Sequence, residues 1–109
     1  MAKKSFELSE NKGRGYARNF ALNNTLGEIV VIWDIDDLYT SNRLMEVYNA
    51  IQSGYDYFCS YALLVDNKLN LKGARHFYSN SEIIPKFVHP TLAIKKSILV
   101  SNNLSYDIN

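Results

Sequence analysis

Residues 27–39 constrain the fold of this chain more than any other stretch. They contain the apolar run 29–33 and then three aspartates within four positions, Asp34, Asp36 and Asp37. A short, unbroken and largely β-branched run is typical of a strand buried on both faces, as in a parallel sheet covered by helices. Ligands of open α/β sheets bind just beyond the carboxyl ends of the strands. The three carboxylates are therefore predicted to lie where such a protein performs its chemistry.

Length and composition limit the class of protein. With 109 residues, of which 47% are hydrophobic and 21% charged, the chain has room for one packed domain, which we expect to comprise residues 1–109. A net charge of +1, from 12 basic and 11 acidic residues, gives no electrostatic basis for binding nucleic acid. Cys59 is the single cysteine, and no apolar stretch is long enough to span a bilayer. We therefore expect a cytoplasmic protein, at most peripheral to the inner face of the membrane.

Apolar periodicity predicts alternating strands and helices along the chain. The expected elements are an edge strand at 5–9, a helix at 16–26 that Gly27 terminates, the buried strand, a helix from Thr40 or Ser41 to Ser53, a strand at 57–65, a turn at 66–68 leading to an alternating stretch at 69–72, a strand at 91–94 and a helical segment at 95–100. The second helix should bury an apolar stripe formed by Leu44, Val47, Tyr48 and Ile51. Farther along the chain, Ser79 and Glu82 form a possible capping box, but Pro85 limits the helix that follows to a short one. Because a strand, a helix and a strand in succession imply a right-handed crossover, we expect an α/β fold with a mainly parallel sheet flanked by helices and a small hairpin.

The three aspartates after the strand suit a hard divalent cation. Mg²⁺ and Mn²⁺ prefer oxygen ligands, and a few carboxylates together with substrate phosphates complete their coordination shell. A cation held in this way neutralises the charge of a diphosphate. The alternative is a solvated acidic loop that caps the following helix.

Several motifs in a fixed order carry a resemblance to a known family. The hydrophobic strand is preceded by Asn11, Gly13, Gly15, Ala17-Arg18-Asn19, Leu22 and Gly27-Glu28, and is followed by Asp34-x-Asp36-Asp37, Arg43-Leu44 and the segment 89–97, which reads His-Pro-Thr-Leu-Ala-Ile-Lys-Lys-Ser. This combination resembles family 2 glycosyltransferases of the GT-A fold over about residues 11–107. The resemblance implies a metal-dependent transferase that passes a sugar from a nucleotide-diphosphate donor to a hydroxyl group of a saccharide or another acceptor.

The resemblance also implies roles for the aspartates. Asp34 and Asp36 match the Asp-x-Asp motif of the family, so they would bind Mn²⁺ or Mg²⁺ and the ribose or diphosphate of the donor. Asp36 is the first choice as metal ligand, and Asp37 is a neighbouring candidate.

The glycine-rich segment 13–19 matches the part of the family that lies against the nucleotide. Gly13 and Gly15 would let the backbone approach the donor closely, and Arg18, or Arg14 as the second choice, would contact the base or a phosphate. The alternative for both arginines is ordinary charge on a helix surface.

Two departures from the family pattern limit the activity that we expect. Little sequence precedes Asn11 to supply the strand and loop that hold the base in such domains. In the family, a pair of carboxylates near the end of the domain includes the base that deprotonates the acceptor. Asp107 matches the position that typically precedes this pair, so the sequence ends before it. We therefore expect an internal fragment of a catalytic domain that has little activity alone, with its general base beyond Asn109.

Two further hypotheses remain open from the sequence. Residues 32–38 also resemble the first motif of haloacid-dehalogenase-type phosphatases, in which Asp34 would be the nucleophile and Asp36 a general acid, although Leu38 stands where Thr or Val is usual. Alternatively, the chain is a non-catalytic module whose unpaired sheet edge associates with a second copy.

Several other residues are weaker candidates. His89 either faces the donor phosphates or the acceptor, or is a packed structural residue, and His76 is weaker still. Trp33 is either a stacking surface or a core aromatic at the end of the strand. Four tyrosines either line an acceptor groove or fill the core, and these are Tyr39, Tyr55, Tyr57 and Tyr61.

Overall fold

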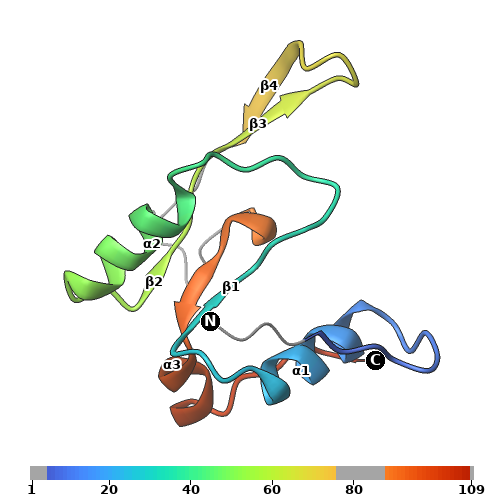
Figure 1. Ribbon diagram of the computed structural model, residues 1–109, viewed down its shortest axis with the longest axis vertical. Coiled ribbons are helices and arrows are strands. Elements are labelled where there is room, and N and C mark those ends of the chain that lie inside the picture. The colour runs from blue at the N-terminus through green and yellow to red at the C-terminus, as the bar shows by residue number, and fades with distance from the viewer. Residues whose placement is uncertain (1–4, 76–87, 109) are drawn as a thin grey trace.

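The computed structural model describes residues 5–75 and 88–108 (Figure 1). In chain order the elements are helix α1 (Arg14–Asn24), strand β1 (Ile29–Val31), helix α2 (Arg43–Gln52), strands β2 (Tyr57–Phe58), β3 (Ala62–Val65) and β4 (Leu71–Arg75), the 3₁₀ turn η1 (His89–Thr91), strand β5 (Ala93–Lys95) and helix α3 (Lys96–Ser101). Among the described helices, none has the length and apolar character needed to cross a bilayer.

The central sheet has three strands in the order β1-β5-β2. Both pairings are antiparallel, with Val30 of β1 opposite Ile94 of β5 and Tyr57 of β2 opposite the same residue. The prediction of a mainly parallel sheet is wrong, because β5 enters between the two earlier strands and runs against both. The α/β class is confirmed, since helices lie beside this sheet and a separate hairpin leaves it.

The core lies between α2 and the central sheet. Val47 and Ile51 of α2 pack with Ala93 of β5, and all three are buried. The partly buried side chains around them are Ile29, Val31 and Phe58. This contact holds α2 against the strand after which the acidic segment begins.

The buried face of α2 differs from the predicted one. Leu44 and Tyr48 were expected in the apolar stripe but are 58% and 53% exposed, whereas Arg43 is only 6% exposed. The buried positions therefore repeat every four residues, from Arg43 through Val47 to Ile51. The helix turns a guanidinium inward at its first residue, next to the end of β1.

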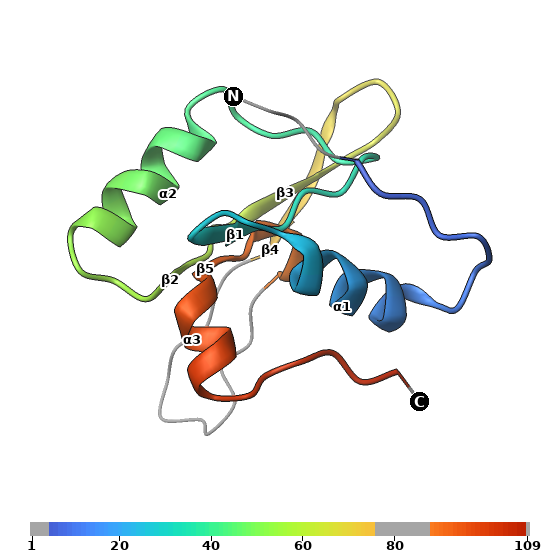
Figure 2. The ribbon, with the colours of Figure 1, turned by 60° about the horizontal axis from the view of Figure 1, so that its bottom comes forward.

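The C-terminal segment after α3 returns along α1 (Figure 2). The side-chain amide of Asn19 donates from Nδ2 to the carbonyl oxygen of Tyr106 at 2.9 Å, and its Oδ1 accepts from the Tyr106 N–H at 2.7 Å. One helical turn earlier, Gly15 lies against the carbonyl group of Asp107, where a Cβ would collide with the oxygen. The face of α1 that carries Gly15 and Asn19 therefore binds the end of the described chain.

Strands β3 and β4 form a hairpin that projects from the body of the domain (Figure 1). Asp66 stabilises its turn, since Oδ1 accepts from the N–H groups of Lys68 at 2.8 Å and Asn70 at 3.0 Å. The predicted hairpin is confirmed. The single strand expected at 57–65 is wrong, because the chain divides there into β2 and β3, which belong to different sheets.

The N-terminal elements differ in part from the prediction. Residues 5–9 form no strand, and the ring of Phe6 instead packs edge-on against Phe20, with 5.9 Å between the centroids. The helix expected at 16–26 begins and ends two residues earlier, so Gly27 does not terminate it.

The remaining elements follow the same pattern of correct type and shifted bounds. Helix α2 begins after Asn42, without a side-chain cap from Thr40 or Ser41. The strand expected at 91–94 is β5, which begins two residues later because η1 occupies the chain up to Thr91. The helical segment expected after it is confirmed as α3. The predicted capping box at Ser79 and Glu82, with Pro85 and His76, lies outside the described residues.

Candidate active site

The three aspartates occupy a tight turn just beyond β1, which we call the acidic turn (residues 34–37). The N–H of Ile32 donates to the carbonyl of Leu92 at 3.0 Å and extends the pairing with the β5 side of the sheet. The turn then closes with a hydrogen bond from the N–H of Asp37 to the carbonyl of Asp34 at 3.2 Å. Asp34 is half-buried, whereas Asp36 and Asp37 are exposed. The carboxylates therefore lie at the end of the strand and remain accessible.

The geometry of the acidic turn fits a divalent cation. One carboxylate oxygen from each of Asp34, Asp36 and Asp37 lies within 4.8 Å of the other two. Such a set supplies hard oxygen ligands from one side and leaves other coordination positions for substrate oxygens and water. Within the described part of the chain, it is the one group of three His, Cys, Asp or Glu residues with this proximity.

A buried arginine lies behind the acidic turn. The guanidinium carbon of Arg43 is 4.3 Å from the centroid of the Tyr39 ring and 4.9 Å from that of Trp33, and the two rings are 4.4 Å apart. Its Nη2 donates to the carbonyl of Pro90 at 3.1 Å. Desolvation by burial lowers the pKa of Arg43, although an arginine remains charged at any physiological pH.

The hydroxyl group of Tyr39 joins the acidic turn to η1. It accepts from the N–H of Asp34 at 2.9 Å and donates to the carbonyl of Pro90 at 3.2 Å. Tyr39 therefore belongs to the framework of the site. The other three tyrosines considered in the sequence do not fill the core, because all are substantially exposed, and these are Tyr55, Tyr57 and Tyr61.

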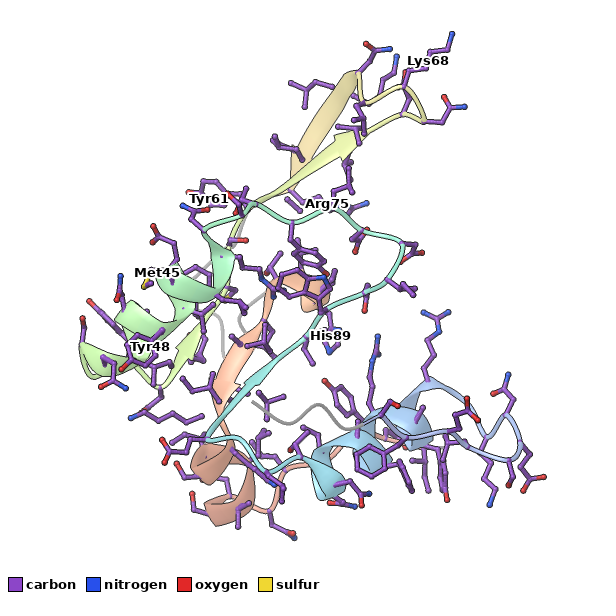
Figure 3. The ribbon with its side chains drawn as sticks, viewed as in Figure 1. Met45, Tyr48, Tyr61, Lys68, Arg75 and His89 are labelled. Carbon is purple, nitrogen blue, oxygen red and sulfur yellow. The ribbon has the colours of Figure 1, made fainter. Side chains whose placement is uncertain are left out.

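His89 and Tyr106 form a second polar group beside the acidic turn. Nε2 of His89 lies 2.7 Å from the Tyr106 hydroxyl, and the guanidinium of Arg18 lies 5.5 Å from the centroid of the same ring. Figure 3 places His89 next to the chain that leaves β1. Residues from α1, η1 and the C-terminal segment thus meet near the end of that strand.

Burial and neighbouring charges shift the pKa values of this pair. Desolvation lowers the pKa of His89, and the charge of Arg18 lowers it further, while the charge of Asp34 opposes both. Desolvation raises the pKa of Tyr106; the charge of Arg18 lowers it, and the charge of Asp34 raises it. Both side chains are therefore neutral near pH 7, and the charges of Arg18 and Asp34 both act at this pair.

We expect the imidazole of His89 to titrate below the ordinary histidine value of 6.5. Because the folded state resists protonation of this ring, the unfolded state binds more protons as the pH falls below 6.5, and the free energy of unfolding decreases until the folded ring is also protonated. Proton NMR of the imidazole C–H resonances measures the titration, with His89→Gln to assign them. A midpoint at or above 6.5 would contradict the expected environment.

The remaining predicted nucleotide-binding residues lie along the start of α1. Gly13 precedes the helix with a φ of 93°, a value that favours glycine, and no atom lies within 4 Å of its hypothetical Cβ. Arg14 is exposed, whereas Arg18, one turn later, is half-buried against Tyr106. The structure therefore places Arg18 against Tyr106 and leaves Arg14 at the surface, while Gly15 packs on the C-terminal segment.

A comparison with protein-family models assigns the chain. Residues 4–106 match the family described as Glycosyl transferase family 2. The chain belongs to this family. The match favours a glycosyltransferase over the phosphatase hypothesis. Searches of curated proteins and of solved structures gave no match.

Two side chains of this family 2 glycosyltransferase domain were not predicted as site residues. Arg43 was noted only as part of the family motif, and no site role was assigned to it. Its burial could have been inferred from its position four residues before Val47 and eight before Ile51, on the same face of the helix. Tyr106 gave no signal in the sequence, because its role depends on the return of the C-terminal segment to α1.

Proposed function

We propose that this domain binds a nucleotide-diphosphate sugar and passes the sugar to a hydroxyl group of a saccharide or another acceptor. The observation that carries the proposal is the acidic turn, where oxygens of Asp34, Asp36 and Asp37 lie within 4.8 Å of one another at the end of a strand. Membership of glycosyl transferase family 2 supports a nucleotide sugar as the donor.

The acidic turn would hold Mn²⁺ or Mg²⁺. Asp36 is the first choice as ligand because it belongs to the Asp-x-Asp motif and its side chain is exposed, with Asp34 and Asp37 on either side of it. When bound, such a cation neutralises charge that develops on the diphosphate leaving group. The N–H of Asp34 donates to the Tyr39 hydroxyl, which holds the backbone that carries this carboxylate.

Arg18 would bind the anionic part of the donor. Its guanidinium lies 5.5 Å from the centroid of the Tyr106 ring, and its charge and that of Asp34 both act on the pKa values of His89 and Tyr106. A guanidinium in such a place pairs well with phosphate oxygens. Gly13 and Arg14, at the start of α1, remain open to a donor, whereas the side of Gly15 that would face a ligand is covered by the backbone of Asp107.

Two other expectations stay predictions from the sequence. These are a cytoplasmic or membrane-peripheral location and self-association through a sheet edge. The proposal itself is tested by binding of a nucleoside diphosphate, because the proposed site is one for the donor.

A thermal-shift assay with nucleoside diphosphates tests the proposal. We expect one nucleoside diphosphate of a panel to raise the melting temperature when Mn²⁺ is present and to raise it much less with EDTA. A ligand at 100 times its Kd stabilises a folded protein by about 2.7 kcal/mol. Stabilisation by a phosphate mimic such as vanadate, with none by any nucleoside diphosphate, would contradict the proposal and favour phosphatase chemistry.

A further inference from the structure

Arg43 occupies an environment that needs an explanation. It is 6% exposed, and a buried charge is normally compensated by an ion pair. Within residues 5–75 and 88–108, no carboxylate forms an ion pair with Arg43, and its buried Nη1 has no hydrogen-bond partner. Its surroundings are instead two aromatic rings and the carbonyl of Pro90. A buried polar group with an unsatisfied donor is uncommon in a native fold.

The two rings that contact Arg43 flank the acidic turn in the sequence. Trp33 immediately precedes Asp34, and Tyr39 follows Asp37 by two residues. Because both rings lie against one guanidinium, the entry and exit of the acidic turn are held together. We call these three residues, Trp33, Tyr39 and Arg43, the arginine clamp.

The arginine clamp also joins the acidic turn to η1. Arg43 and Tyr39 both donate to the carbonyl of Pro90, at 3.1 and 3.2 Å. The Tyr39 hydroxyl at the same time accepts from the N–H of Asp34 at 2.9 Å. A shift of Tyr39 would therefore move the backbone of Asp34 relative to the segment that carries His89, and Arg43 holds Tyr39 in place through its contact with the ring.

We propose that Arg43 and Tyr39 are positioning residues that set the spacing of the three carboxylates for cation binding. This inference rests on the proposed metal site and adds to it the groups that hold its ligands in place. Residues that orient metal ligands in this way typically change metal affinity or activity by about 10- to 100-fold when they are replaced.

Terbium luminescence provides a direct measurement. Tb³⁺ is a hard cation that binds carboxylate sites, and Trp33, the single tryptophan of the chain, is adjacent to Asp34 and can sensitise its emission. Tyr39→Phe keeps the ring on Arg43 and removes only the hydroxyl. We expect it to weaken Tb³⁺ binding by about 10-fold or more, with little change in the melting temperature.

Two further variants separate positioning from folding. Tyr48→Phe removes a hydroxyl from an exposed tyrosine on the outer face of α2 and should bind Tb³⁺ like the wild type (Figure 3). Arg43→Lys keeps the charge but loses the planar fork, so it should also weaken Tb³⁺ binding.

The outcomes distinguish the inference from the proposed function. Wild-type affinity in both Tyr39→Phe and Arg43→Lys would overturn the positioning role and leave the metal site intact. Failure of the wild-type protein to bind Tb³⁺ through Asp36, judged by an unchanged signal in Asp36→Asn, would overturn the metal site and the positioning role together.

Discussion

Asp36→Asn is expected to lose cation binding almost completely. The substitution removes an anionic ligand from a site of three carboxylates, and even replacement of groups that only orient such ligands lowers affinity by about 10- to 100-fold. We therefore expect more than about 100-fold weaker Mn²⁺ or Tb³⁺ binding and loss of the Mn²⁺-dependent stabilisation by nucleoside diphosphate. Titration of Tb³⁺ emission and the thermal-shift assay measure the two effects independently.

The matched control is Asp56→Asn. Asp56, immediately before β2, is exposed and forms a 3.5 Å surface ion pair with Lys95, so the variant removes one negative charge without changing a residue of the acidic turn. Surface pairs of this kind contribute about 0 to 1 kcal/mol. If both asparagine variants weakened Tb³⁺ equally, the effect would come from net charge and the acidic turn would not be a specific site.

Gly15→Ala is expected to displace the C-terminal segment from α1. The added Cβ would collide with the carbonyl oxygen of Asp107 and lie 3.2 Å from its carbonyl carbon, and a backbone group cannot rotate away as a flexible side chain can. We expect a loss of about 2 to 3 kcal/mol in the free energy of unfolding, as for overpacked sites, although alanine itself favours a helix. Chemical denaturation measures the loss.

The same substitution should disturb the site. Moving the segment breaks the paired hydrogen bonds between Asn19 and Tyr106 and separates Tyr106 from His89. The pKa of His89 should then move back toward its ordinary value, because the ring becomes more hydrated. Gly27→Ala is the control, since the nearest atom to its added Cβ is 3.7 Å away, and its effect should stay within about 0.5 kcal/mol. Equal stability of the two variants would contradict the docking of the segment on Gly15.

The acidic turn shows how much of the site could be predicted from local sequence. Its three aspartates are separated by at most one residue, so any tight turn after the strand brings the carboxylates together, whatever the rest of the fold does. The apolar run before them and the apolar spacing after them are also local signals, and they correctly gave a strand and a helix. The hairpin was predictable for the same reason, because Asp66 organises its own turn.

The order of the strands in the central sheet could not be predicted from local sequence. Residues 29–31 are apolar on both faces whether their neighbour runs parallel or antiparallel, so the pattern could not reveal that β5 lies between β1 and β2. The buried face of α2 was misassigned for a related reason. An arginine is normally taken as exposed, and only the rings of Trp33 and Tyr39 make a buried position for Arg43.

The family, the acidic turn and the type of most elements that the structure describes could be predicted from the sequence. The antiparallel sheet, the burial of Arg43 and the contacts of Tyr106 with His89 and Arg18 depend on tertiary packing. The difference lies in the range of the interactions. A turn or a helix stripe is set by residues a few positions apart, whereas His89 and Tyr106 meet Arg18 only after the chain has packed a strand into the sheet and returned along α1.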